Sequence, residues 1–135
     1  MLRRIDALGA AGLAFFVANI AHSLDHQRQG TERLTTEVMV GGTIITILAV
    51  VTLVLALRRH PQAPLVATVV GLWTALGVTS SHILPHWSAF SDPYPDLNVD
   101  AFSWLIVLAE IGAAAVLGLV GLRGLLRRAP RPASV

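Results

Sequence analysis

The sequence of 135 residues contains no cysteine and no lysine, and only 13% of its residues are charged. The absence of cysteine excludes disulfide bonds, thiolate metal ligands and a cysteine nucleophile, so we expect any bound metal ion to have nitrogen and oxygen ligands. The chain also has no Walker, dinucleotide-binding or Gly-x-Ser-x-Gly motif. The usual sequence signatures of nucleotide-binding proteins and serine hydrolases are therefore missing.

Apolar residues make up 54% of the chain, and the charged share is well below the roughly 25% of a soluble domain. Four apolar stretches are long enough to cross about 30 Å of hydrocarbon at about 1.5 Å per residue. They are Ala7–Leu24, Val38–Leu57, Pro64–Leu84 and Ala101–Leu122. Because lipid offers no partner for unpaired backbone groups, the sequence predicts an all-α fold, an integral membrane bundle of four transmembrane helices.

The chain contains no internal repeat and no loop long enough to fold separately, so we expect a single domain over residues 1–128. No Ala-x-Ala cleavage pattern closes the first span, which we therefore expect to be retained as a helix. Residues 129–135 contain two prolines and are predicted to form a flexible cytoplasmic tail.

Charge is distributed unevenly between the two ends of the predicted bundle. One set of helix ends carries eight arginines: Arg3, Arg4, Arg58, Arg59, Arg123, Arg127, Arg128 and Arg131. The opposite ends hold two arginines and six acids: Arg28, Arg33, Asp25, Glu32, Glu37, Asp92, Asp96 and Asp100. Arginine excess on the cytoplasmic side then predicts an N-in/C-in topology, with the acidic loops outside.

Two further features of composition bear on location and partners. The exclusive use of arginine as the basic residue is typical of a GC-rich bacterial genome, so we expect a multi-pass protein of the bacterial inner (plasma) membrane. The arginines flank apolar spans and form no basic stripe with interleaved aromatics, so no nucleic-acid partner is expected. Four aromatic residues near the outer ends of the last two spans are predicted to anchor the chain at the lipid headgroups: Trp87, Phe90, Tyr94 and Trp104.

Four of the five histidines form two pairs, His22/His26 and His82/His86, at outer helix ends. A spacing of four residues puts both members of a pair on one helical face. Asp25 belongs to the same polar stripe as the first pair. Pro85 disfavours helical backbone at the residue before it. Whether His86 shares a helical face with His82 is therefore left open.

Small residues recurring every fourth position indicate which helical faces lie inside the bundle, because they let transmembrane helices approach closely. On the first span we assign the face of Ala10, Ala14 and Ala18 to the interior, together with the polar stripe that ends in the histidines. On the third span, Gly71, Ala75 and Thr79 form a ridge that leads towards His82. The two pairs of histidines are therefore predicted to meet.

Two glutamates are additional candidates for the site. Glu110 lies deep in the fourth span above Ala114 and Gly118, where an ionised side chain costs on the order of 3 kcal/mol. We expect it to be protonated or paired inside the bundle. Glu37 could supply a carboxylate at the outer end of the second span, or it could be a solvated acid that favours a helix N-terminus.

Imidazole nitrogens beside a carboxylate suit Zn²⁺ or Cu²⁺. The sequence therefore predicts a divalent metal site near the extracytoplasmic face between the first and third spans. Its candidate ligands are His22, Asp25, His26, His82 and His86, with Glu37 and Glu110 as possible additions.

Two alternatives to a metal ion site remain open at this point. One is electron transfer by a b-type haem held between a histidine of the first span and a histidine of the third. The other is a non-catalytic accessory subunit, whose small-residue ridges would pack against a second copy or a larger membrane complex.

The segment His22-Ser-Leu-Asp25-His26 resembles the H-x-x-E-H motif of inverted zincins, with aspartate in place of glutamate. The resemblance covers five residues and would imply a zinc-dependent membrane peptidase. A chain of 135 residues offers no room for the protease domain of that family. Whether the protein is an enzyme therefore stays open, and no catalytic residue is predicted.

Overall fold

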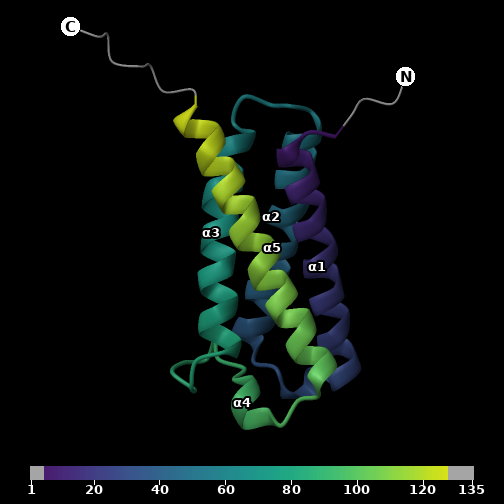
Figure 1. Cartoon of the computed structure of the whole chain (residues 1–135). Helices are drawn as coiled ribbons and strands as arrows, with labels where there is room; N and C mark the ends of the chain where they lie inside the picture. Colours follow the sequence, from purple (N-terminus) through teal and green to yellow (C-terminus); the bar gives the residue numbers. More distant parts are fainter. Residues whose placement is uncertain (1–4, 128–135) are drawn as a thin grey trace, which may run out of the picture.

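The computed structural model describes residues 5–127, which form a bundle of four long helices (Figure 1). These are α1 (Ala7–Gln29), α2 (Thr36–Leu57), α3 (Ala63–His82) and α5 (Ala101–Leu126). The connections contain a short 3-10 helix, η1 (Thr31–Arg33), and the single-turn helix α4 (Tyr94–Leu97). All four long helices are long and apolar enough to span a membrane. The all-α membrane bundle is confirmed, whereas the predicted tail over 129–135 lies outside the described residues.

Side-chain caps explain where three of the helices begin. The carboxylate of Asp6 accepts from the Gly9 amide at 2.9 Å, and the hydroxyl of Thr35 accepts from the Val38 amide at 3.2 Å. Asp100 caps α5 in the same way. Each cap satisfies an amide that has no partner within its own helix. The predicted starts at Ala7 and Ala101 are therefore correct, and α2 begins two residues earlier than predicted.

The helix ends that face the candidate site differ from the predicted ones. α1 continues past Leu24 to Gln29 and stops at Gly30, whose φ of 95° favours glycine. α3 ends at His82, two residues before the predicted Leu84, because Pro85 disfavours helical backbone at the residue before it. His82 is thus the last residue of its helix.

The closest contact in the bundle is between α3 and α5. A Cβ atom added to Gly71 would lie 2.6 Å from the carbonyl oxygen of Ala114 and would overlap the backbone of Gly118. Glu110, Ala114 and Gly118 are all buried. Gly71, at the start of the ridge predicted on α3, therefore packs against the ridge predicted on α5.

The small-residue prediction for α1 was wrong. Ala10 and Ala14 are exposed and Ala18 is only half-buried, while the buried face passes through Phe15 and Asn19. Phe15 is fully buried in the core. Because a large aromatic side chain fills the centre of the bundle, α1 is rotated by about one residue, or 100°, from the orientation that the alanines suggested.

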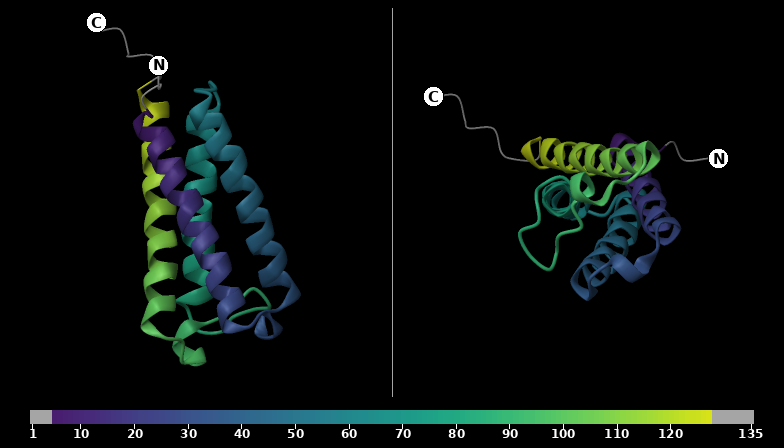
Figure 2. Two further views of the ribbon diagram at one scale, coloured as in Figure 1. Left: turned by 90° about the vertical axis from the view of Figure 1, so that its right-hand side faces the viewer. Right: turned by 90° about the horizontal axis from the view of Figure 1, so that it is seen from below.

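α2 is packed much more loosely than the other three long helices. In an apolar stretch of 18 residues of α2, 11% of the residues are buried, compared with 33–39% in the corresponding stretches of the other three long helices. Figure 2 shows α2 diverging from α3 towards the end of the bundle that carries α4. The helix therefore leaves room for a cavity on its inner side.

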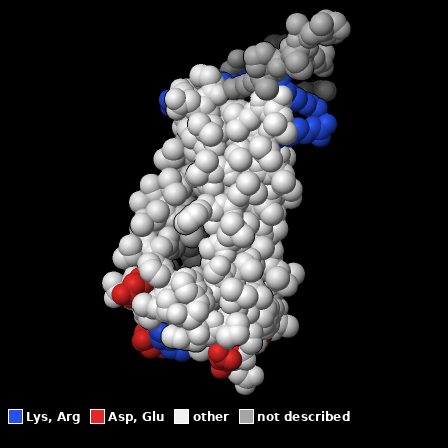
Figure 3. Space-filling model, turned by 90° about the vertical axis from the view of Figure 1, so that its left-hand side faces the viewer, with Lys and Arg blue, Asp and Glu red and all other residues white. Residues whose placement is uncertain are grey.

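The charged residues gather at the two ends of the molecule. Figure 3 shows basic residues at one end, mainly acidic residues with a smaller basic patch at the other, and an uncharged surface between them. The basic end of the described chain carries Arg58, Arg59, Arg123 and Arg127. An uncharged band between two charged ends is the arrangement expected of a bundle that crosses a bilayer.

Candidate metal centre

Three histidines from two helices converge at the acidic end of the bundle. His22 and His26 lie on successive turns of α1, and His82 is the last residue of α3. The ring centroids are 4.6 Å apart for His22/His26, 4.8 Å for His22/His82 and 5.2 Å for His26/His82. One nitrogen from each ring lies within 4.8 Å of the others. We call these three residues the histidine cluster.

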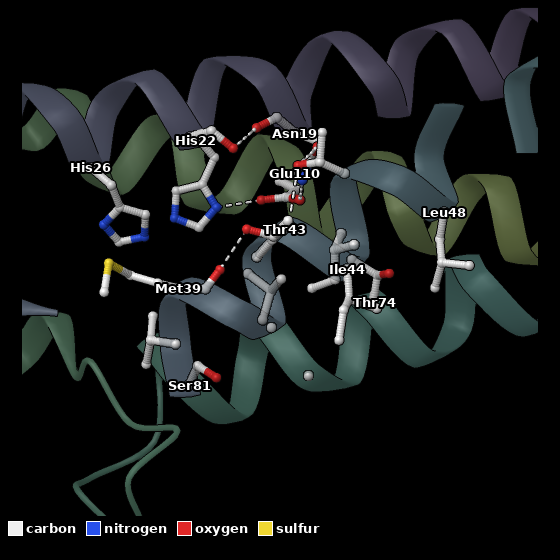
Figure 4. Close-up of a pocket in the computed structure, with 18 of the residues that line it drawn as sticks. Asn19, His22, His26, Met39, Thr43, Ile44, Leu48, Thr74, Ser81 and Glu110 are labelled. Atoms are coloured by element: carbon white, nitrogen blue, oxygen red, sulfur yellow. Dashed lines mark hydrogen bonds and ion pairs between the residues drawn. The ribbon is translucent and has the colours of Figure 1, made fainter. Parts of the chain in front are cut away.

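A buried network of side-chain hydrogen bonds holds His22 in position. Its Nδ1 contacts Oε2 of Glu110, which is 1% exposed, and the other oxygen of that carboxyl accepts from Nδ2 of Asn19 at 2.9 Å. Thr46 of α2 donates to Oδ1 of Asn19, also at 2.9 Å. Figure 4 shows Asn19 and Glu110 beside the His22 ring. The predicted inward, paired position of Glu110 is thus confirmed, and the network joins α1, α2 and α5.

His82 is held by the loop that follows α3. Its Nδ1 lies 3.0 Å from the backbone carbonyl oxygen of Asp92, and the Asp92 amide donates to the Ser81 carbonyl at 2.9 Å. A carbonyl oxygen can only accept, so the proton of the neutral His82 ring is on Nδ1. The loop is thereby folded back onto the end of its own helix.

The hydrogen bonds assign the lone pairs of two of the rings. With Nδ1 of His22 directed at Glu110 and Nδ1 of His82 at the Asp92 carbonyl, the lone pair of each neutral ring is on Nε2, and that of His22 faces the Tyr94 hydroxyl. Metal-binding histidines usually have this arrangement, in which the other ring nitrogen donates to a carboxylate or a carbonyl.

Tyr94 is part of the site, although the sequence predicted an anchor in the lipid headgroups. The residue is 1% exposed, and its ring centroid lies 4.8 Å from that of His82. Its hydroxyl is 3.3 Å from Nε2 of His22. Burial raises the pKa of Tyr94 to about 12, so the phenol stays neutral and available as a donor. Neither spacing nor composition of the loop distinguished Tyr94 from its exposed aromatic neighbours.

Asp92 was predicted to lie in an acidic outer loop and was not among the candidate ligands. Its carboxylate oxygen Oδ2 lies 3.6 Å from Nδ1 of His82 and 3.8 Å from Nδ1 of His26. Burial raises the pKa of this carboxyl. Asp92 therefore lies behind two rings of the cluster, where its backbone and side chain both face imidazole nitrogens.

Asp25, a predicted ligand, is buried but lies outside the histidine cluster. Its two oxygens accept from Nε of Arg28 at 2.8 Å and from Nε2 of Gln29 at 2.7 Å. Nη2 of Arg28 and Nε2 of Gln29 each donate to the Ser103 hydroxyl of α5 at 2.9 Å. Asp25 thus joins α1 to α5, because its position three residues after His22 turns it towards a different neighbour.

The structure does not bring His86 or Glu37 to the cluster. His86 is exposed in the loop beyond the end of α3, where Pro85 has already ended the helix. Glu37 is exposed in the first turn of α2, at the rim of the adjoining cavity. Its position agrees with the solvated acid that was the alternative interpretation.

A cavity of about 760 Å³ adjoins the histidine cluster. All three histidines and Glu110 contribute to its wall, and the remainder comes mostly from apolar residues of α2 and α3. In Figure 4, the Met39 sulfur lies beside the His26 ring at one end of this space, and Leu48 lies at the other end. The cluster is therefore open on one side.

The chain matches no protein-family model, and neither a curated protein nor a solved structure matches it. The chemistry of the site is accordingly inferred from its own residues.

Proposed function

We propose that this protein binds one divalent transition-metal ion, Zn²⁺ or Cu²⁺, through His22, His26 and His82. The observation that carries the proposal is the convergence of three imidazoles from two helices, with one nitrogen of each within 4.8 Å of the others. We place the site near the extracytoplasmic face of the bacterial inner membrane, because it lies at the acidic end of the bundle.

The distances are compatible with metal binding after a small closure of the rings. Nitrogens bound at 2.0–2.1 Å to a tetrahedral zinc ion are about 3.4 Å from one another. The cluster holds its nitrogens within 4.8 Å, so rotations about the side-chain torsions would bring them together. Three protein ligands leave one coordination position for water or another ligand.

The surroundings of the cluster favour a cation. Ionised Glu110 would accept from Nδ1 of His22, make that imidazole a stronger ligand and contribute one negative charge beside a doubly charged ion. The Asp92 carbonyl serves His82 in the same way. A bound ion would also explain why an acidic side chain is kept almost fully buried in the apolar span of α5.

A haem between His22 and His82 has less support from this geometry. The two rings pack edge to face, with their centroids 4.8 Å apart. The ring of Tyr94 packs against His82. A porphyrin would have to separate all three rings in order to place its iron between the histidines. A single ion needs only the closure described above.

The proposal can be tested by elemental analysis and absorption spectroscopy of the protein purified in detergent. We expect one equivalent of zinc or copper in the wild type and less than a tenth of this in His22→Ala or His82→Ala. The matched control is His86→Ala, an exposed histidine at the same end, which should keep the full equivalent. A Soret band would show that the site binds haem and not a single metal ion. If neither a Soret band nor a stoichiometric metal were found, the accessory-subunit alternative would be favoured.

A further inference from the structure

The cavity beside the histidine cluster has the size and position of a binding site for a hydrophobic molecule. Its volume of about 760 Å³ falls within the range of roughly 300–1,000 Å³ that is usual for small-molecule pockets. It lies among α1, α2 and α3 in the uncharged part of the bundle, and the surface of this part is visibly hollowed in Figure 3.

Three glycines contribute to the open space. A Cβ atom added to Gly41 or Gly42 of α2, or to Gly77 of α3, would meet no atom within 4 Å. All three residues line the cavity. By contrast, Gly71 and Gly118 allow two backbones to touch. The glycines beside the cavity thus leave space unfilled where larger side chains would fit.

The length of the cavity matches one leaflet of a membrane. Along α2 it is lined from Glu37 to Leu48, which corresponds to about 16 Å at 1.5 Å per residue. Half of a hydrocarbon core of about 30 Å is about 15 Å. A single hydrocarbon chain lying parallel to the helices would therefore fill the cavity from its outer end to about the middle of the bilayer.

The polar end of such a molecule would meet the histidine cluster. His26 is half-buried and lines the cavity. The carboxylate oxygen Oδ2 of Asp92 lies 3.8 Å from Nδ1 of His26. An ion held by three neutral imidazoles has an open coordination position. A carboxylate would supply the missing ligand, since Zn²⁺ accepts carboxylate oxygen at about 2.0–2.2 Å.

We infer that the cavity binds one long-chain carboxylic acid, with its hydrocarbon chain along α2 and its carboxylate on the open position of the ion. The head-group part of this inference rests on the proposed metal site, whereas the binding of the chain depends only on the cavity. The two parts can therefore be tested separately.

The binding experiment uses cis-parinaric acid, a fluorescent long-chain carboxylic acid, with the metal-loaded protein in nanodiscs. Energy transfer from Trp73, which lines the cavity, reports binding after subtraction of the signal from Trp73→Phe. We expect saturable binding of one equivalent. Gly42→Leu and Gly77→Leu should each weaken it at least tenfold and leave the metal content unchanged, because leucine would occupy the open space.

The matched control is Gly112→Leu. Gly112 also has no atom within 4 Å of an added Cβ atom, but it lies on α5 and does not line the cavity. It should bind the probe as the wild type does. Wild-type affinity in both cavity variants, with folding verified by circular dichroism, would overturn the inference.

The head group is tested with the methyl ester of the same probe, which lacks the carboxylate, and with acetate, which lacks the chain. The ester should bind the metal-loaded protein about tenfold more weakly than the acid. For the His82→Ala variant, ester and acid should have equal affinities. Acetate at the probe's concentration should not compete. Equal affinity of acid and ester for metal-loaded protein would overturn the head-group assignment, and an absence of metal from the wild type would refute the proposed function instead.

Discussion

The two sides of the bundle are built in opposite ways. Between α3 and α5, glycines bring the backbones into contact, and Gly71 lies directly against Ala114 and Gly118. Beside the cavity between α2 and α3, Gly41, Gly42 and Gly77 instead adjoin empty space. The close interface positions His82 and Glu110, which belong to those two helices, while the loose side leaves the histidine cluster accessible. Glycine in a membrane helix thus indicates close packing only where another backbone approaches it.

The largest effect that would test this comparison is expected from Gly71→Leu. The leucine side chain would overlap backbone atoms of α5, and overpacking of this kind costs about 1–3 kcal/mol or more of stability. We expect a thermal unfolding midpoint in detergent lowered by several degrees, or failure to fold. Gly77→Leu, on the same helix but beside open space, should unfold within about a degree of the wild type. Similar midpoints for the two variants would contradict the contrast between the two sides.

Substitutions of Glu110 test the buried network on the close side. Glu110→Leu removes the acceptor for Asn19 and the partner of His22, and each unsatisfied buried group costs about 1–3 kcal/mol. Its unfolding midpoint should therefore fall clearly.

Glu110→Gln separates stability from metal binding. The glutamine oxygen can still accept from Asn19, and its amide can donate to Nδ1 of His22, so stability should stay near that of the wild type. This hydrogen bond moves the ring proton to Nε2, where an ion would have to bind. We expect metal affinity to fall about 10–100-fold, as is usual when such a partner of a ligand is lost. Unchanged affinity in a metal titration would show that Glu110 does not support the ligand.

Thr46 links the loose helix to this network, since its hydroxyl lies 2.9 Å from Oδ1 of Asn19 as well as 3.0 Å from the Gly42 carbonyl oxygen of its own helix. Thr46→Val should lower the free energy of unfolding by about 1 kcal/mol, the usual contribution of one hydrogen bond. Thr43 is the matched control, because its hydroxyl donates to the Met39 carbonyl of its own helix. Thr43→Val should be nearly neutral in denaturant unfolding. Equal effects would mean that the bond between the helices adds nothing.

The smallest effect is expected at the exposed acidic end of the bundle, where Arg28 pairs with Asp100 at 3.0 Å. The amide of Ser103 and the guanidinium of Arg28 lower the pKa of Asp100 to about 2. A lowered folded-state pKa stabilises the protein fully above the unfolded value near 3.9, and this stabilisation is lost as the pH falls towards 2.

Asp100→Asn tests this assignment. The difference in unfolding midpoint between Asp100→Asn and the wild type should be constant from pH 7 to about pH 5 and should shrink between about pH 4 and pH 2. A difference that instead grows in acid would show that Asp100 has the opposite linkage to folding.

Features that depend on one stretch of chain were predicted well. The four spans follow from continuous hydrophobicity, which acts within each stretch of chain. His22 and His26 lie on one face because four residues make about one helical turn. The burial and pairing of Glu110 followed from the cost of an isolated charge in an apolar span.

Other features depended on how separate segments meet, and the sequence alone did not determine them. Repeating small residues define a face within a helix but not its rotation against neighbours, so Phe15 rather than the alanines came to face the core. Asp25 and Asp92 are both acids near the histidines in sequence. The rotation of α1 turns the first towards α5, and the return of the loop brings the second behind His82 and His26.

Hydrophobicity and helical periodicity by themselves determined that this chain forms a four-helix membrane bundle with four of its five histidines at one end, because both act over a few consecutive residues. The small-residue ridges also predicted that His82 would meet His22 and His26, as it does. Only the tertiary structure decided that His86 stays outside and that Tyr94 is buried beside the cluster. It also decided that a cavity adjoins the cluster. The depth and rotation of one helix against another are determined by contacts between residues far apart in the chain, such as Gly71 against Gly118, which no local pattern contains.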